Sequence, residues 1–209
     1  MAQFEAARLS FAQLLRARGL SDRRGLYLKI GAHTYYSVLS FGRFAELDRV
    51  RADRVRALAK IDKSLTDEYD RLSDDGLTFP HASEIWSEAP GLSYLPTGRR
   101  LTEAVQVVIE DVKPTADYEA AWKPIAEALK KAQYPVERRT YFSSYGSGRT
   151  LSFWLAPSVA VVKAAPTLLQ AVSSVVGAEK ATALLDAWRA CVTSSQELDV
   201  EARPEMSAY

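Results

Sequence analysis

The sequence predicts an α+β fold built from two similar halves. Amphipathic helical stretches alternate with short strand-like runs, and motifs of the first half recur in the same order 113 to 115 positions later. A repeat of this length indicates a duplicated domain, because solenoid units are much shorter. Two similar halves usually pack about a pseudo-twofold axis. The recurring motifs are Phe4-Glu5-Ala6-Ala7 and Tyr118-Glu119-Ala120-Ala121, Arg23-Arg24 and Arg138-Arg139, and Pro90-Gly91-Leu92-Ser93 and Pro204-Glu205-Met206-Ser207.

In the first half, the apolar spacing predicts a helix over residues 4–18 that ends at Gly19. Two strands are expected at about 24–31 and 35–40, joined by a hairpin turn at Gly31-Ala32-His33-Thr34. A long helical region follows from about Phe44 to Leu72. A last strand at about 82–88 completes this half.

The second half predicts a strand at 104–112 and a helix at 117–131, with Asp117 as its N-cap. A hairpin of strands 138–145 and 150–155, a helical region at 167–194 and a strand at 195–201 follow. This β-α-β-β-α-β order is the ferredoxin-like pattern. We therefore expect a first ferredoxin-like repeat at residues 1–96, a linker at 97–103 and a second repeat at 104–209.

The first repeat lacks an opening strand, which would leave two sheet edges unpaired. We expect either that the native chain starts earlier or that another segment fills the gap. Arg23-Arg24 and Arg138-Arg139 stand at strand starts, where they are expected to pair with carboxylates of a neighbouring strand or of the other half.

Composition excludes several classes of function. The 27 basic and 26 acidic residues give a net charge of +1, so no nucleic-acid partner is expected. No apolar run is long enough to cross a membrane. The single cysteine, Cys191, is expected to be a buried and inert thiol. Two histidines without ligand spacing predict no metal and no cofactor.

These features also set expectations about assembly and location. The chain is expected to be a monomer or a homodimer. It would be cytoplasmic as given, and exported or periplasmic if its N-terminus has been trimmed.

Three segments resemble the dimeric α+β barrel superfamily in a fused, tandem form. They are Tyr118-Glu119-Ala120-Ala121 after a strand, the hairpin at residues 146–150, and the closing Arg203-Pro204-Glu205-Met206-Ser207. More narrowly, the chain resembles a bacterial family distantly similar to antibiotic-biosynthesis-monooxygenase-like and NIPSNAP-like proteins. The resemblance implies an intramolecular pseudo-dimeric barrel. Relatives in the superfamily include cofactor-independent monooxygenases and isomerases.

In such a barrel, helices cover one face of each sheet and the other faces meet inside. Strand residues alternate between the two faces. The apolar set is expected to face the helices: Leu26, Leu28, Ile30, Tyr36, Val38, Ile85, Val105, Val107, Ile109, Leu151, Phe153, Leu155, Leu198 and Val200. The mixed polar and aromatic set is expected to face the interior: Tyr27, Lys29, Tyr35, Ser37, Leu39, Glu84, Trp86, Glu88, Gln106, Val108, Glu110, Phe142, Ser144, Thr150, Ser152, Trp154, Glu197, Asp199 and Glu201.

An apolar cavity with a few polar groups is typical of a small-molecule site, so we expect a small hydrophobic or aromatic ligand inside the barrel. Glu110, Glu84 or Glu197 could act as a base if burial raised its pKa. Lys29 could stabilise developing negative charge. The expected ligand-binding residues are Tyr27, Tyr35, Trp86, Gln106, Phe142, Ser144, Ser152, Trp154 and Asp199.

Four interpretations stay open at this point. The first is a small-molecule-binding protein. The second is a cofactor-independent monooxygenase or isomerase acting on an aromatic or enolisable substrate. The third is an assembly protein that pairs through its incomplete sheet edge. In the fourth, the polar strand residues line a wet interface and do no chemistry.

Overall fold

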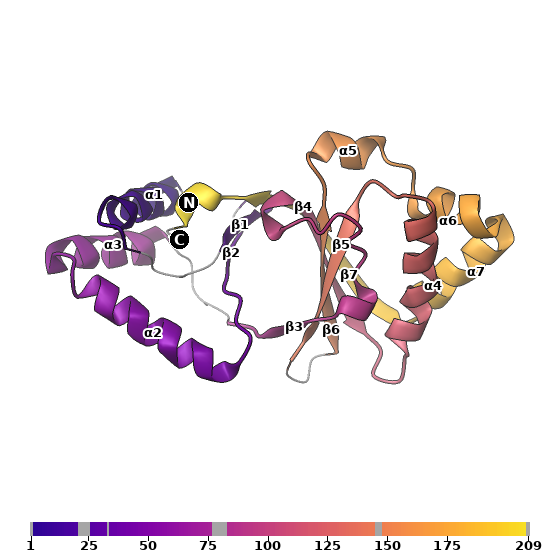
Figure 1. Cartoon of the computed structure of the whole chain (residues 1–209), viewed down its shortest axis with the longest axis horizontal. Coiled ribbons are helices and arrows are strands. Elements are labelled where there is room, and N and C mark those ends of the chain that lie inside the picture. The colour runs from indigo at the N-terminus through magenta and orange to yellow at the C-terminus, as the bar shows by residue number, and fades with distance from the viewer. Residues whose placement is uncertain (1, 21–25, 33, 77–82, 145–147, 208–209) are drawn as a thin grey trace. The chain divides into compact units, whose positions relative to one another are not determined.

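The computed structural model describes residues 2–20, 26–32, 34–76, 83–144 and 148–207, and the chain divides into two compact units. Unit 1 comprises residues 1–82 together with 202–209, and unit 2 comprises residues 83–201. Each unit combines helices with antiparallel strands, so the predicted α+β class is confirmed (Figure 1). The predicted boundaries at residues 96 and 104 follow the sequence repeat, and the duplication itself stays a prediction.

Unit 2 is organised around an antiparallel sheet of five described strands. They are β3 (Trp86–Glu88), β4 (Ala104–Val112), β5 (Glu137–Ser143), β6 (Arg149–Leu155) and β7 (Val192–Ala202). Hydrogen-bonded neighbours give the order β7-β4-β6-β5-β3. The four strands from β4 onward therefore have the order of a split βαβ unit, and β3 adds to the free edge of β5.

Helices α4 (Tyr118–Lys131), α6 (Leu168–Val176) and α7 (Ala178–Ala190) lie together on one side of these strands (Figure 1). The short α5 (Val159–Ala164) comes between β6 and α6 in the chain. Their core includes Trp122, Ile125, Leu129, Val172 and Leu185. The helical region predicted as one piece at 167–194 breaks at Gly177, whose φ of 85° ends α6. The last strand then begins at Val192, three residues earlier than expected.

Unit 1 contains α1 (Ala2–Ala17), β1 (Leu26–Ile30), β2 (Thr34–Val38), α2 (Phe44–Leu58) and α3 (Lys63–Gly76). The strands form the predicted hairpin, although His33 in its turn lies outside the described residues. Helix α1 packs on α3, where the rings of Phe11 and Tyr69 stack at 4.1 Å. The predicted helix from Phe44 to Leu72 is two helices, because Asp62 accepts from the Ser64 N–H at 2.8 Å and starts α3 anew.

The recurring Pro-x-apolar-Ser motif forms the same local structure in both units. Each copy is a short 3₁₀ turn, η1 (Pro90–Leu92) in unit 2 and η3 (Pro204–Met206) in unit 1. Leu92 and Met206 are fully buried. Each turn contacts the first helix of its unit, α4 or α1, and a strand, β5 or β1. The strand that precedes η1 is shorter than predicted, since β3 covers only residues 86–88.

The predicted assignment of strand faces is wrong in both units for most of the residues that the core clusters place, although Val105 packs against the helices as predicted. In unit 2, Val108, Phe142 and Trp154 pack in the cluster formed with the helices, so Val107 and Phe153 lie on the opposite face by alternation. In unit 1, Tyr27 and Tyr35 pack with Phe4 of α1. The mixed polar and aromatic face thus lies under the helices, and the helices supply rings and polar partners that compensate its burial.

The N-cap of α4 provides a test of this local structure. The Asp117 carboxylate accepts from the Ala120 N–H at 2.9 Å. Replacing Asp117 with Ala leaves that donor without its partner, and we expect the free energy of unfolding to fall by about 1 kcal/mol. Urea denaturation followed by tryptophan fluorescence measures the change. The matched control is Asp186→Ala in α7, an exposed partner of Arg189 that should change stability by less than about 0.5 kcal/mol. Equal losses of unfolding free energy in Asp117→Ala and Asp186→Ala would contradict the role of Asp117 as the N-cap.

Candidate functional site

A charged network is buried between the sheet and α4 in unit 2. Arg138 on β5 is 1% exposed and Glu110 on β4 is 3% exposed. The Arg138 Nη2 atom lies 3.4 Å from Glu110 Oε2 and donates to the hydroxyls of Tyr118 and Ser152, both at 2.8 Å. The hydroxyls of Tyr118 and Thr150 donate to the same carboxylate oxygen. The two charges therefore neutralise one another inside a set of hydroxyl groups.

Three tryptophans surround the buried guanidinium. The Arg138 Cζ atom lies 3.7 Å from the ring centroid of Trp122 and 5.7 Å from those of Trp154 and Trp188. Its Nε and Nη1 atoms are buried and have no hydrogen-bond acceptor. The aromatic faces provide the compensation, because a desolvated cation over an indole ring gains about 2 kcal/mol.

Tyr118 joins this network from the start of α4. Burial raises the pKa of its hydroxyl, while the Arg138 charge acts in the opposite direction and Glu110 adds to the increase. The hydroxyl therefore stays protonated at neutral pH and remains a donor to the Glu110 carboxylate.

Tyr118 also lines a surface groove of about 480 Å³, here called the Tyr118 groove. The ring of Phe142 meets that of Tyr118 edge to face, with centroids 6.1 Å apart. The loop between β4 and α4 forms one wall and is held by the Val112 N–H donating to the Gly148 carbonyl at 2.6 Å. The remaining lining residues are Lys113, Pro114, Thr115, Ala116, Asp117 and Glu119.

Gly148 permits this close approach of the hairpin to β4. Its φ is 56°, in the region that favours glycine. A Cβ atom at this position would meet the Val112 carbonyl oxygen at 3.0 Å. A side chain here would push the hairpin away from the groove wall.

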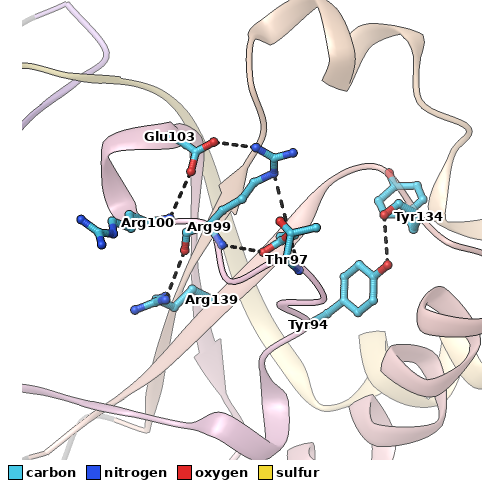
Figure 2. Close-up of polar contacts among 8 residues, drawn as sticks. Tyr94, Thr97, Arg99, Arg100, Glu103, Tyr134 and Arg139 are labelled. Carbon is cyan, nitrogen blue, oxygen red and sulfur yellow. Dashed lines mark hydrogen bonds and ion pairs between the residues drawn. The ribbon is translucent and has the colours of Figure 1, made fainter.

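A second carboxylate, Glu137, anchors a loop from the opposite face of β5. It is 2% exposed and accepts from the backbone N–H groups of Thr97 and Arg99 at 2.9 and 3.0 Å, and from the Thr97 hydroxyl. Figure 2 shows the Arg99 guanidinium extending from this turn to Glu103, at 2.5 Å, and Arg139 donating to the Arg99 carbonyl at 3.2 Å. The loop thus has one defined conformation.

The segment that precedes this loop forms a wall of a smaller groove of about 290 Å³, here called the Tyr94 groove. Gly91, Ser93, Tyr94, Leu95 and Pro96 line one side, and Lys123, Ala126, Glu127 and Lys130 of α4 line the other. The Tyr94 hydroxyl donates to the Tyr134 carbonyl at 3.0 Å (Figure 2).

Unit 1 has a polar cluster around Glu5 on α1. The carboxylate lies 2.9 Å from Lys29 Nζ and 3.6 Å from Arg203 Nη1, and it accepts from the Tyr35 hydroxyl. The hydrogen bonds from Tyr35 and Lys29 lower the pKa of Glu5 from 4.5 to about 2. Glu5 therefore links the helix, the hairpin and the C-terminal segment as a carboxylate.

The structure distributes the predicted site residues over several places. Four of them, Glu110, Phe142, Ser152 and Trp154, come together beneath the helices of unit 2. Lys29 and Tyr35 meet at Glu5. The ring of Tyr27 lies 4.6 Å from the guanidinium of Arg8, which is fully buried.

The remaining predicted residues lie at half-buried or exposed positions on the strands or directly beside them. Gln106 donates to Glu197 and stands opposite Asp199 in the register. The Ser144 and Ser87 hydroxyls are 2.8 Å apart. Trp86 and Glu84 both contact Arg149, with the ring 5.8 Å from its Cζ atom. The roles predicted for all these residues stay predictions.

The predicted pairing of the double arginine with a neighbouring strand is confirmed for Arg139, whereas Arg138 pairs with a carboxylate two strands away. Arg138 pairs with Glu110, and Arg139 lies 3.8 Å from Glu88 on the neighbouring strand β3. Arg23, Arg24, His33 and His81 lie outside the described residues. Within the described ranges, no three His, Cys, Asp or Glu side chains gather as metal ligands. No helix of the described chain has the length and apolar character needed to span a bilayer.

The site residues missed by sequence reasoning are Tyr118, Glu137, Trp122 and Trp188. Two signals were present in the chain. An arginine inside a strand needs a buried partner when both faces of the sheet are covered. Trp122 and Trp188 on inward helix positions provide rings that can face a cation.

Two solved structures are similar to this chain at low sequence identity. No protein-family model matches it, and no curated protein matches it. A "putative monooxygenase" from Lactobacillus acidophilus NCFM has a similar structure with a TM-score of 0.49 and 10% identity, over 95% of this chain and 87% of the other. A "putative monooxygenase" from Fusobacterium nucleatum subsp. nucleatum ATCC 25586 has a TM-score of 0.49 and 7% identity, over 95% and 84%. These values are too low to transfer an activity.

The buried ion pair is testable by a double-mutant cycle. Replacing Arg138 with Met leaves the buried Glu110 without its cation, and we expect the free energy of unfolding to fall by about 3 kcal/mol. The double variant Glu110→Leu/Arg138→Met removes both charges and should recover part of that loss. Chemical denaturation measures the two single variants, Glu110→Leu and Arg138→Met, and the double variant. The control Arg149→Met breaks the partly exposed pairs with Glu84 and Asp111 and the contact with the Trp86 ring, and it should cost less than about 1 kcal/mol. A loss for Arg138→Met no larger than that control would contradict the buried pair.

The Glu5 cluster makes unit 1 sensitive to acid. Because the folded-state pKa of Glu5 lies below its ordinary value of 4.5, its stabilising contribution is complete above that pH and is lost as the pH falls toward 2. Tyr35→Phe removes one hydrogen bond, so the pKa of Glu5 should rise toward 4.5. Carboxyl ¹³C NMR titration measures this shift. Tyr36→Phe on the same strand is the control, and a similar shift in that variant would exclude Tyr35 as the cause.

Proposed function

We propose that the protein binds a small, flat, uncharged aromatic molecule in the Tyr118 groove and does no chemistry on it. The observation that carries the proposal is a groove of about 480 Å³ in which Tyr118 and Phe142 meet edge to face. This volume lies in the range of small-ligand sites. Phe142 is half-buried and can contact a further ring, a contact worth about 0.5–1.5 kcal/mol, while Tyr118, which is 3% exposed, holds the Phe142 ring in place.

The groove is preformed, which favours binding. Tyr118 is held by Glu110 and Arg138 from below. The Lys113 N–H donates to the Cys191 carbonyl at 2.9 Å, and Asp117 caps the helix that follows. A ligand entering such a site orders few side chains, so little of its interaction energy is lost.

The charges of the lining favour an uncharged ligand. One ammonium, that of Lys113, stands with the carboxylates of Asp117 and Glu119. Asp117 already accepts from the Ala120 N–H. The lining therefore has an excess of one negative charge, which disfavours an anion. Asp117 and Glu119 are exposed, and ion pairs with exposed carboxylates stabilise little, so a cation gains little either.

The enzyme alternative has less support from the same contacts. A general base needs a carboxylate within reach of a substrate proton. Glu110 is 3% exposed and already accepts from three side chains, while Glu197 accepts from Gln106. Lys29 is paired with Glu5. These engagements favour structural roles, although turnover of a phenolic probe by the wild type and not by Glu110→Gln would favour the enzyme.

Protein-observed NMR titration with 2-naphthol tests the binding proposal. We expect saturable shifts at residues 112–119 and at Phe142. Phe142→Ala should weaken binding about fivefold, because it removes an aromatic contact worth about 1 kcal/mol. Phe44→Ala in unit 1 is the control, since it removes an aromatic ring that is 55% exposed and does not line the groove. Shifts that map elsewhere, or an equal effect of both variants, would contradict the proposal.

A further inference from the structure

We propose that the Tyr94 groove is a second, separate binding site and that its ligand is a small aromatic carboxylate. This inference goes beyond the Tyr118 groove in both place and ligand chemistry. It rests on three properties of the described residues: a rigid wall, an excess of positive charge on the opposite wall, and an apolar floor.

The rigid wall is the segment from Gly91 to Pro96. The backbone of Tyr94 pairs with that of Arg138 in both directions, at 2.7 and 2.8 Å. Thr140 donates its N–H to the Ser93 hydroxyl at 3.0 Å. Beyond Pro96, the buried Glu137 carboxylate accepts from the Thr97 N–H and hydroxyl. The groove therefore exists before a ligand arrives.

The opposite wall is one face of α4. Lys123, Glu127 and Lys130 stand at positions i, i+4 and i+7, so they share that face. Ala126 lies among them, and its small side chain gives the groove its depth. Two ammonium groups and one carboxylate leave an excess of one positive charge, which attracts an anion.

Lys123 is the cation of the groove that we expect to bind the carboxylate of the ligand. Lys130 stands in the last turn of α4, where a cation complements the helix dipole without any ligand. Lys123 stands in the first half of the helix, where the dipole does not favour a cation. Among the described residues, the structure gives the Lys123 ammonium no ion pair. A carboxylate in the groove would supply its partner.

The apolar residues that line the Tyr94 groove favour a ligand with an apolar ring. Tyr94, Leu95 and Pro96 line the groove together with Ala126, and Tyr94 is 4% exposed. A volume of about 290 Å³ stands at the lower end of small-ligand sites and holds one small ring system. A ligand whose ring packs against Tyr94 and Pro96 and whose carboxylate pairs with Lys123 contacts both walls of the groove.

Titration with 1-naphthoate, followed by NMR, tests this site. We expect saturable shifts at residues 91–96 and on α4. Lys123→Gln should bind 1-naphthoate about fivefold more weakly than the wild type does. The neutral 1-naphthalenemethanol should bind the wild type about as weakly as 1-naphthoate binds Lys123→Gln. Ala126→Leu should abolish binding by filling the groove. Lys131→Gln is the matched control, because it removes an exposed lysine of α4 that does not line the groove.

Two outcomes overturn the proposal. Equal weakening by Lys123→Gln and Lys131→Gln would show a general charge effect. Weakening of 1-naphthoate binding by Phe142→Ala, with no effect of Lys123→Gln, would place the carboxylate in the Tyr118 groove. That second result would contradict the Tyr94 site and leave binding at the Tyr118 groove intact. Conversely, if 1-naphthoate binds at Lys123 and 2-naphthol does not bind at all, only the proposed function is refuted.

Discussion

The burial of the Arg138 charge is the constraint on which unit 2 depends. A guanidinium that is 1% exposed needs an anion, acceptors and polarisable neighbours, or its desolvation would cost several kcal/mol. Glu110 supplies the anion from β4, Tyr118 supplies a hydroxyl from α4, and the tryptophans supply aromatic faces. These groups come from strands and helices distant in the chain. The charge can therefore be buried only when sheet and helices are assembled together.

The alternation of β5 extends this constraint to the other face of the sheet. Arg138 points toward the helices, and the adjacent Glu137 points away from them and holds the turn at Thr97. The backbone of Arg138 also pairs with Tyr94. One strand thus fixes Tyr118 beside one groove and the Tyr94 segment beside the other. Both grooves owe their shape to two adjacent charged residues that are almost fully buried.

Local signals in the sequence predicted most elements correctly. Asp117 caps α4, and the hairpin strands lie within a few residues of their expected bounds. The Pro-x-apolar-Ser motif, found only as a repeated string, has the same turn and the same kind of helix and strand contacts in both units. Helix breaks at Asp62 and Gly177 were missed because the apolar spacing continues across them. A capping side chain or a positive φ outweighs periodicity at such positions.

The strand faces could not be predicted from hydrophobicity alone, and the candidate site depended on them. The expectation placed Glu110, Ser152 and Trp154 away from the helices because their face is less apolar. In the structure Glu110 is paired with Arg138, Tyr118 and Thr150, and Ser152 is bonded to Arg138 and Thr140, so their polar atoms cost little to bury. That compensation depends on which strands are neighbours, and β4 and β5 meet only through β6. Which polar side chains meet depends on the order of the strands in the sheet, and no single strand sequence contains that information. The sequence therefore identified Glu110 as a candidate site residue but did not identify Arg138 as its partner.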